Sequence, residues 1–255
     1  MRLQTLATAL SAGSVVAAAD WATAYTKANA ALAKLSSNDK INIVTGVGWN
    51  KGPCVGNTAA VSSIGYPQFC IQDGPLGVRY GKSVNAFTPG IQAASTWDRA
   101  LIRERGKFMG EETKGCGVHV LLGPVSGPLG KQPAGGRNWE GFGSDPYLQG
   151  IAMAETIEGL QGAGVQANAK HFILNEQELN RDTMSSTVDD RTMHELYLWP
   201  FADAVHSNVA SVMCSYNKIN VRDHFELPPR VQEILDQPLT YIVPREHGRA
   251  RTTGP

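Results

Sequence analysis

The chain has 255 residues, of which 42% are hydrophobic and 18% are charged, and its 23 Lys and Arg balance its 23 Asp and Glu to a net charge of zero. This is the composition of a water-soluble globular protein, and without a basic excess we expect no nucleic-acid partner. The length is compatible with one α/β barrel, one sandwich-sized domain or two small domains.

The first 19 residues predict a secretory signal peptide. Arg2 is followed by a short apolar run that ends in small residues, among them Ala17 and Ala19. This run is too short to span a bilayer comfortably, and a buried N-terminal helix is the alternative. No other apolar run in the sequence approaches the roughly 20 residues of a membrane helix. We therefore expect a secreted, extracellular protein without a membrane partner, and the sequence leaves its oligomeric state open.

In a secreted protein the four cysteines can form disulfides, because disulfides persist in oxidising compartments. Cys54 and Cys70 bracket a loop rich in Gly, Pro and Asn, and we expect them to form a disulfide. Cys116 and Cys214 lie in different predicted elements, and the sequence leaves open whether they meet in space. No Cys-x-x-Cys or His-x-x-x-His spacing is present, so we expect neither a metal nor another cofactor.

Apolar residues at helical spacing predict four helices in the body of the chain. The first is amphipathic and is followed by a Gly-rich stretch at 46–53, whereas the second has mixed charge and is closed by Gly115 and Gly117. The last contains Pro200. In chain order, the predicted helices span residues 22–43, 101–114, 147–160 and 190–206.

Short runs of β-branched and apolar residues predict three strands between these helices, at 118–122, 165–172 and 210–217. Alternating strands and helices indicate parallel βαβ units. Each predicted strand leads into polar or Gly-rich residues, and in a (β/α) barrel the carboxyl ends of the strands share the face that holds the active site. We therefore predict an α/β protein with a TIM-like (β/α) barrel. A doubly wound open sheet is the alternative, although no Gly-x-Gly-x-x-Gly motif follows a strand.

The composition changes after Asn220. Residues 221–255 contain five prolines and a mixture of Arg, Asp and Glu. This composition predicts a divergent tail that does not continue the βαβ alternation and is either disordered or forms one short helix at 231–235.

The run from Lys170 to Arg181 follows an apolar approach and opens onto polar and charged residues. A lysine and a histidine side by side at the end of a buried strand, Lys170 and His171, direct donors at the same small volume, which suits recognition of sugar hydroxyls. For this pair taken alone, a solvated loop after a core strand is the alternative.

Four motifs follow one another along the chain: Gln72-Asp73-Gly74-Pro75-Leu76-Gly77-Val78-Arg79, Gly136-Arg137-Asn138-Trp139-Glu140-Gly141-Phe142-Gly143-Ser144-Asp145-Pro146, Ala169-Lys170-His171-Phe172 and Val212-Met213-Cys214-Ser215-Tyr216-Asn217. In this order they resemble the motifs of fungal glycoside hydrolase family 3 β-glucosidases. The resemblance covers about residues 21–220, and it implies that residues 20–220 are part of a TIM-like N-terminal domain that is incomplete at its C-terminal end.

The resemblance implies hydrolysis of terminal non-reducing β-D-glucosyl residues, with retention, in the breakdown of cellulose and related polysaccharides. The substrates it implies are cellobiose and short β-glucosides. It also implies that the carboxylate of Asp73 accepts hydrogen bonds from sugar hydroxyls, and that the side chains of three further residues donate to others through partly charge-assisted bonds. These donors are Arg137, Lys170 and His171.

Three further residues match positions near the same pocket, namely Arg79, Met213 and Tyr216. The resemblance places Tyr216 beside the nucleophile and gives Met213 the role of an apolar wall. Taken singly, several of these residues also fit purely structural roles: Asp73 can order its own turn, Met213 can be a core residue, and Arg137 can pair with Glu140 or Asp145.

Retaining hydrolysis needs two carboxyl groups about 5–5.5 Å apart. The resemblance implies a nucleophilic aspartate in a Thr/Ser-Asp-Trp motif downstream of Ser-Tyr-Asn, and an acid/base glutamate in a second, α/β sandwich domain. The sequence after Asn217 holds no such motif and no cysteine that would pair with Cys214 as in the family. We therefore expect no catalytic residue and negligible turnover from this chain, and we hypothesise a frameshift, a retained intron or a mispredicted exon at Val221. A non-catalytic sugar-binding fragment and a related exo-acting β-xylosidase are the alternatives.

Overall fold

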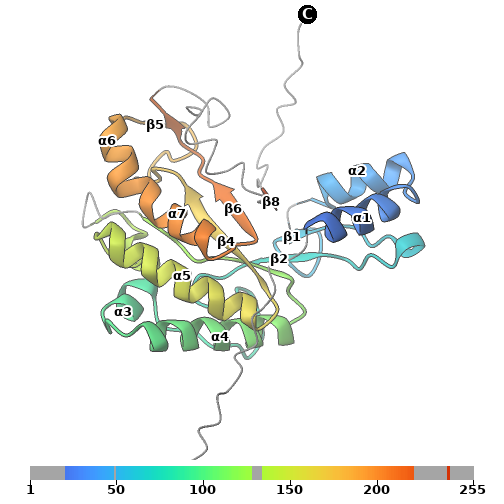
Figure 1. Ribbon diagram of the computed structural model, residues 1–255, viewed down its shortest axis with the longest axis horizontal. Coiled ribbons are helices and arrows are strands. Elements are labelled where there is room, and N and C mark those ends of the chain that lie inside the picture. The colour runs from blue at the N-terminus through green and yellow to red at the C-terminus, as the bar shows by residue number, and fades with distance from the viewer. Residues whose placement is uncertain (1–20, 49, 128–133, 221–239, 242–255) are drawn as a thin grey trace, which may run out of the picture.

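The computed structural model of the chain describes residues 21–48, 50–127, 134–220 and 240–241 (Figure 1). All neighbouring strands of its main sheet run parallel except the first pair, which is antiparallel. A second sheet pairs β5 (Ser185–Ser186) with β7 (Lys218–Ile219). The main sheet has six strands in the spatial order β1 (Gly56–Asn57), β2 (Cys70–Asp73), β3 (Val120–Leu122), β4 (Gln166–Phe172), β6 (Ser211–Cys214) and β8 (Thr240–Tyr241).

Helices connect the central strands of the main sheet, so strand and helix alternate as predicted. The connection from β2 to β3 holds α3 (Gly90–Ala94) and α4 (Arg99–Gly115), and the connection from β3 to β4 holds α5 (Pro146–Gly162). The connection from β4 to β6 holds α6 (Asp190–Thr192), the π-helical segment η3 (Met193–Leu198) and α7 (Trp199–His206). In the described part of the chain the sheet keeps two open edges, β1 and β8, so the predicted incomplete TIM-like barrel is confirmed.

The hydrophobic core lies between the parallel strands and the helices that cover one of their faces. Helix α5 packs between α4 and α7 (Figure 1). The strands contribute small and apolar side chains to this core, and the helices contribute longer ones. Its buried members include Leu121, Ala167, Ala169, Met109, Met153, Ile157 and Phe201.

Glycines allow α4 and α5 to approach closely. A Cβ atom added at Gly159 of α5 would overlap the carbonyl oxygen of Arg103 in α4. A Cβ atom at Gly106 of α4 would lie 2.8 Å from the carbonyl oxygen of Thr156 in α5. Because backbone rather than a flexible side chain occupies this space, neither position accepts a side chain without moving a helix.

The predicted helix at 22–43 is wrong in its length, because the structure has two helices there, α1 (Trp21–Leu32) and α2 (Ser37–Thr45). The Ser36 hydroxyl accepts a hydrogen bond from the backbone N–H of Asp39, and the Asp39 carboxylate accepts one from the backbone N–H of Ser36. This capping box starts a new helix at Ser37. The Ser-x-x-Asp spacing marks the start of this second helix in the sequence, but a prediction from helical periodicity alone does not detect it.

The predicted helix at 190–206 is confirmed in extent, but over Met193–Leu198, just before Pro200, its backbone hydrogen bonds follow the wider π-helical pattern. Proline lacks the N–H that would bond to residue 196, and its ring crowds that carbonyl group. A local π-helical widening is one way in which a helix accommodates this defect.

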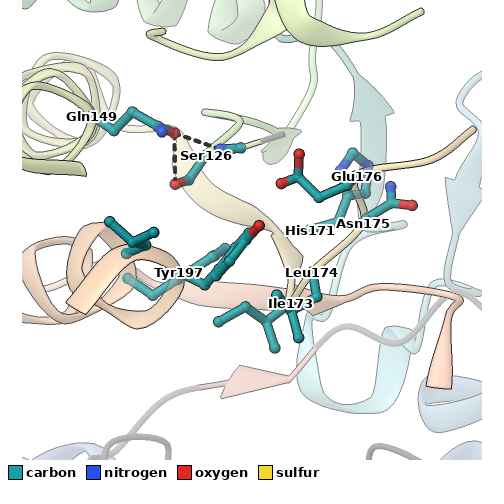
Figure 2. A pocket seen from close by; sticks show the side chains of 11 residues that line it. Ser126, Gln149, His171, Ile173, Leu174, Asn175, Glu176 and Tyr197 are labelled. Carbon is teal, nitrogen blue, oxygen red and sulfur yellow. Dashed lines mark hydrogen bonds between the residues drawn. The ribbon is translucent and has the colours of Figure 1, made fainter. Parts of the chain in front are cut away.

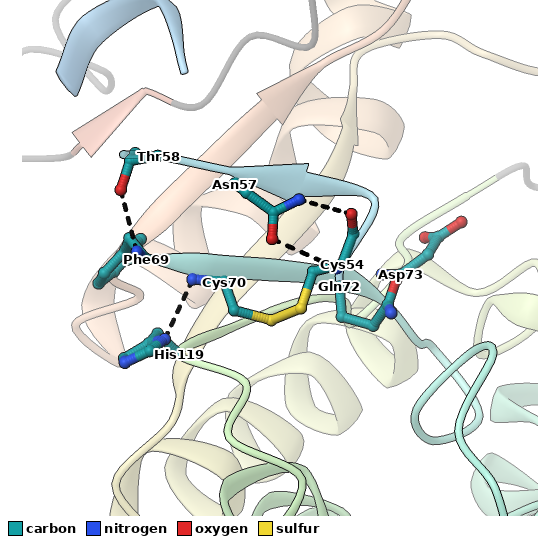
Figure 3. Close-up of a disulfide and its surroundings, with 8 residues drawn as sticks. All are labelled: Cys54, Asn57, Thr58, Phe69, Cys70, Gln72, Asp73 and His119. Atoms are coloured by element: carbon teal, nitrogen blue, oxygen red, sulfur yellow. Dashed lines mark hydrogen bonds between the residues drawn. A yellow bond between two sulfur atoms is a disulfide. The ribbon is translucent and has the colours of Figure 1, made fainter. Parts of the chain in front are cut away.

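The N-terminal edge of the sheet was not predicted from the sequence, because β1 and β2 are short and lie in a Gly- and Pro-rich region. A disulfide joins Cys54 to Cys70, as expected, with their Cα atoms 5.7 Å apart (Figure 3). The Asn57 side chain bonds to both the N–H and the carbonyl group of Cys54, and the backbone N–H of Cys70 donates to Nδ1 of His119 at 3.1 Å. These contacts fix β2, whose last residue is Asp73.

Cys116 is exposed and Cys214 is half-buried, and these two cysteines do not pair with each other. None of the helices in the described ranges is both long enough and apolar enough to cross a membrane.

The tail differs from its prediction at one point, because Thr240 and Tyr241 form β8 beside β6. Their β-favouring side chains were outweighed in the prediction by the surrounding prolines and charges. The proposed helix at 231–235 and the proposed signal peptide both lie outside the described residues.

Candidate functional site

A pocket of about 680 Å³ lies at the carboxyl ends of strands β2, β3, β4 and β6, and we call it the main pocket. This is the face of a (β/α) barrel on which active sites are built, and the volume is in the usual range for small-molecule sites. All seven residues singled out from the sequence line it, so the fold brings them together: Asp73, Arg79, Arg137, Lys170, His171, Met213 and Tyr216.

Asp73 is held between two cations. Nζ of Lys170 lies 2.6 Å from one of its carboxylate oxygens, and the guanidinium group of Arg79 lies 2.8 Å from the other. Burial alone would raise the pKa of Asp73, but Lys170, Arg79 and the more distant Arg137 outweigh burial and lower the pKa below its usual value of 3.8. Asp73 is therefore a carboxylate at neutral pH, and it accepts hydrogen bonds.

Lys170 comes from the centre of the sheet and is only 2% exposed, whereas the Asp73 side chain is 23% exposed. Burial lowers the pKa of Lys170, and Asp73 opposes that shift. The register of β4 against β6 shifts between Ala169 and Phe172, and such an irregularity re-aims the side chains of a strand. The peptide bonds Lys170–His171 and Phe172–Ile173 are cis.

Arg137 is fixed by a two-pronged ion pair. Its Nε and one terminal nitrogen donate to the two carboxylate oxygens of Glu140 at 2.6 and 2.9 Å. Burial would lower the pKa of Arg137, but Glu140, Glu178 and Asp73 raise it. The sequence left open a pairing of Arg137 with Glu140 or with Asp145, and the structure has the former. The same guanidinium group also lines the main pocket.

Glu178 and Arg181 extend this line of alternating charge along the rim. One carboxylate oxygen of Glu178 lies 3.8 Å from a guanidinium nitrogen of Arg137, and the other lies 3.0 Å from a guanidinium nitrogen of Arg181. The guanidinium carbon of Arg181 lies 4.7 Å from the ring centroid of Tyr216. The sequence reasoning assigned no role to Glu178 or Arg181. Both lie in the polar run after β4, so the signal was present, but spacing alone could not show which of its charges turn toward the pocket.

His171 lines the main pocket as a neutral ring. Burial, followed by the nearby charges of Lys170, Arg137 and Arg181, lowers the pKa of His171 well below 6.5. A neutral imidazole offers one donor nitrogen and one acceptor nitrogen. His171 can therefore exchange hydrogen bonds with a neutral hydroxyl group without adding a charge.

The remaining predicted residues give the pocket its apolar surface. Met213 is 6% exposed and packs with Leu122 and Val120, so it belongs to a core cluster and lines the pocket at the same time. Tyr216 lines the rim beside Arg181, and Trp139 is 45% exposed at the pocket. Convergent donors and acceptors beside apolar surface suit a small polyhydroxylated ligand.

The described residues include no group of three or more His, Cys, Asp and Glu side chains that could hold a metal ion. Every carboxylate that lines the main pocket contacts a cation: Asp73 contacts Lys170, and Glu140 and Glu178 both contact Arg137. The geometry is thus that of a binding site with paired charges.

Comparisons with known proteins agree with this description of the fold. The family model "Glycosyl hydrolase family 3 N terminal domain" matches residues 57–239. The chain therefore belongs to glycosyl hydrolase family 3, within its N-terminal domain. Beta-glucosidase cel3A of Pyricularia oryzae is 64% identical over 95% of this chain and 34% of its own length.

Two solved structures extend the comparison. The Beta-D-glucoside glucohydrolase from Trichoderma reesei is 68% identical, with a TM-score of 0.80, over 86% of this chain and 31% of its own. Beta-glucosidase 3B from Thermotoga neapolitana in complex with glucose is 34% identical, with a TM-score of 0.77, over 85% of this chain and 33% of its own. The chain thus spans about a third of the length of these relatives.

The family match extends to residue 239, past the last of the four motifs, which ends at Asn217.

Proposed function

We propose that the main pocket binds the terminal β-D-glucosyl unit of cellobiose and short β-glucosides. The observation that carries this proposal is the carboxylate of Asp73, held between Lys170 and Arg79 at the carboxyl ends of the strands, with Arg137 and the neutral His171 in the same pocket. A pyranose presents a ring of hydroxyl groups, and it needs convergent donors and acceptors of this kind. The glucose complex of the Thermotoga neapolitana relative supports the same ligand.

Each residue then has one role. Asp73 accepts hydrogen bonds from sugar hydroxyls, and Lys170 and Arg137 donate through their remaining N–H groups, since each has more donors than its carboxylate partner uses. His171 supplies one further polar contact, and Met213 packs against the apolar face of the sugar.

We infer that the family reaction, retaining hydrolysis of terminal glucosyl residues in polysaccharide breakdown, needs more than these residues. A retaining site needs one carboxylate free to act as a nucleophile and one carboxyl group able to donate a proton. Neither carboxylate oxygen of Asp73 is free, because Lys170 contacts one and Arg79 the other, and Arg137 contacts both Glu140 and Glu178. The 255-residue polypeptide is therefore expected to hold glucose without measurable turnover, as a sugar-binding fragment.

We also propose that the chain is exported. The support is the pattern of residues 1–19, with Arg2 before an apolar run and small residues at its end. A disulfide between Cys54 and Cys70 is compatible with an oxidising compartment.

Calorimetric titration with glucose, alongside an assay with an aryl β-glucoside, tests the proposal. We expect saturable glucose binding that weakens at least about ten-fold in Asp73→Asn, because the neutral amide loses its charge-assisted bonds to the sugar. Asp190→Asn is the matched control, because Asp190 is an exposed residue of α6. Xylose serves as the competitor that separates a β-xylosidase-like site from a glucose site.

Binding that is equal in the wild type and in Asp73→Asn contradicts the proposed site. Turnover of the aryl glucoside by the wild-type chain contradicts the binding-only role. Tighter binding of xylose than of glucose contradicts the assigned sugar.

A further inference from the structure

Gln149 is a polar side chain of helix α5 that anchors the loop after strand β3. It is fully buried, and its Oε1 accepts hydrogen bonds from the hydroxyl of Ser126, at 3.1 Å, and from the backbone N–H of Gly127 (Figure 2). Because a backbone N–H can only donate, Gly127 fixes which end of the amide carries the oxygen. Gln149 itself does not line the main pocket. Any influence on a ligand there must therefore pass through the residues that it holds.

Packing alone does not account for a glutamine at this position. Nε2 of Gln149 is buried and has no hydrogen-bond partner among the described residues. A buried donor without a partner is costly, and an aliphatic side chain of similar size would fill the space without that cost. The two hydrogen bonds that Oε1 accepts are what the glutamine contributes here.

The anchored loop, residues 124–127, supports the backbone of Lys170. The N–H of Lys170 donates to the carbonyl oxygen of Pro124 at 3.0 Å, and the N–H of Ser126 donates to the carbonyl oxygen of Lys170 at 2.8 Å. Both polar groups of the Lys170 backbone are thus bonded to this loop. On the other side of β4, the register against β6 is irregular at this point. The position of Lys170 therefore depends on loop 124–127.

The same loop contacts the segment that carries the Arg137–Glu140 ion pair. A Cβ atom added at Gly141 would lie 2.9 Å from the carbonyl oxygen of Gly127, so the two backbones meet without a side chain between them. Gly141 directly follows Glu140, which holds the guanidinium group of Arg137 through both carboxylate oxygens. Loop 124–127 therefore touches the backbone at two separate parts of the site.

We propose that Gln149 is a positioning residue of the main pocket, acting through loop 124–127 on Lys170. The contact that it controls is the 2.6 Å ion pair between Nζ of Lys170 and the carboxylate of Asp73. Such a charge-assisted contact tolerates little displacement, because functional side chains must be held within about 0.5 Å of their working geometry. The effect on the ion pair is independent of any ligand, whereas the effect on sugar affinity rests on the proposed function.

The first test needs no sugar. Gln149→Met keeps the size of the side chain but removes the amide oxygen. In a crystal structure of this ligand-free full chain we expect the Asp73–Lys170 contact to lengthen from 2.6 Å by at least about 0.5 Å. Burial raises the pKa of Asp73, and Lys170 is the strongest of the groups that lower it, so a weaker contact should raise that pKa. The pKa is measured by ¹³C NMR titration of the carboxyl group, whose signal is assigned by its loss in Asp73→Asn.

Two further variants separate positioning from a general loss of packing. Thr156→Val is the matched control, because Thr156 is also buried on α5 but its hydroxyl donates within the helix, to the carbonyl oxygen of Ala152 at 2.8 Å. We expect the pKa of Asp73 to stay unchanged in this control. Ser126→Ala removes one of the two bonds to the amide oxygen and keeps the other. It should raise the pKa of Asp73 by less, and it decides the question if Gln149→Met does not fold.

The second test measures glucose affinity by calorimetric titration. We expect binding about five- to ten-fold weaker in Gln149→Met, about two- to three-fold weaker in Ser126→Ala and unchanged in Thr156→Val. Folded Gln149→Met and Ser126→Ala chains in which the Asp73 pKa is unchanged overturn the proposal, and so does a wild-type glucose affinity in both. A wild-type chain that does not bind glucose, while the variants still shift the Asp73 pKa, contradicts only the proposed function.

Discussion

The two partners of the buried ion pair should not be equally costly to remove. In Asp73→Ala, the Lys170 ammonium group stays only 2% exposed, with no second carboxylate in salt-bridge contact among the described residues. Breaking a buried pair in this way costs about 3–5 kcal/mol. In Lys170→Met, Asp73 is still paired with Arg79 at 2.8 Å and is 23% exposed. Its loss of one charged partner costs about 1–2 kcal/mol, so we expect the variants to differ by about 2 kcal/mol.

The difference in stability between the two variants should depend on pH. In Asp73→Ala, burial lowers the pKa of Lys170 even further below 10.5, because the opposing effect of Asp73 is gone. Between that folded-state pKa and 10.5 the unfolded chain binds more protons, so stability rises as the pH is raised. Lys170→Met lacks this group, and the gap between the two variants should narrow at alkaline pH. In the wild type, the lowered pKa of Asp73 adds stability that is lost as the pH falls below 3.8 and through the folded-state pKa.

The assay is urea unfolding, followed by tryptophan fluorescence, at about pH 7 and about pH 9.5 in about 0.15 M salt. Arg191→Met is the control, because its ion pair with Glu195 is exposed, at 82% and 59%, and should change stability by less than about 1 kcal/mol. Equal losses in Asp73→Ala and Lys170→Met, or a difference that does not narrow with pH, would show that the burial of Lys170 is not the main cause of the lost stability.

Three further outcomes are expected from the same unfolding assay. Gly159→Ala should lose about 1–3 kcal/mol, because its Cβ atom would overlap α4, and an unchanged midpoint would refute the close helix contact. Replacing Cys54 and Cys70 by serine should cost about 3 kcal/mol, as for a closed loop of this length, and stability that is insensitive to reductant would argue against the bridge. Glu140→Gln should lose about 1–3 kcal/mol, because Arg137 is left without its two-pronged partner, and a neutral result would mean that Glu178 alone holds the guanidinium group.

The central βαβ units could be predicted from the sequence because their signals are local. The apolar spacing at 101–114 and 147–160 fell inside α4 and α5, and the run 165–172 contained β4. Strands β1, β2 and β8 were not predicted, because they are only two to four residues long and owe their pairing to neighbouring strands. A strand of that length has no periodicity to detect.

The convergence of the seven site residues was implied by the resemblance of the four motifs to the family, and the barrel rule that strand ends share one face agreed with it. The contacts between them could not be predicted. Lys170 and Asp73 are 97 residues apart, and their strands are separated by β3. The contacts of Glu178 depend on which way its loop turns, and no local pattern encodes that direction.

The most direct test of the proposed sugar site is a crystal structure of the full chain soaked with glucose. We expect one glucose in the main pocket, with its hydroxyls within hydrogen-bond distance of Asp73, Arg137, Lys170 and His171, and with the Asp73–Lys170 pair intact. Glucose bound elsewhere, or a main pocket left empty at a concentration that saturates binding in solution, would contradict the assignment of this site.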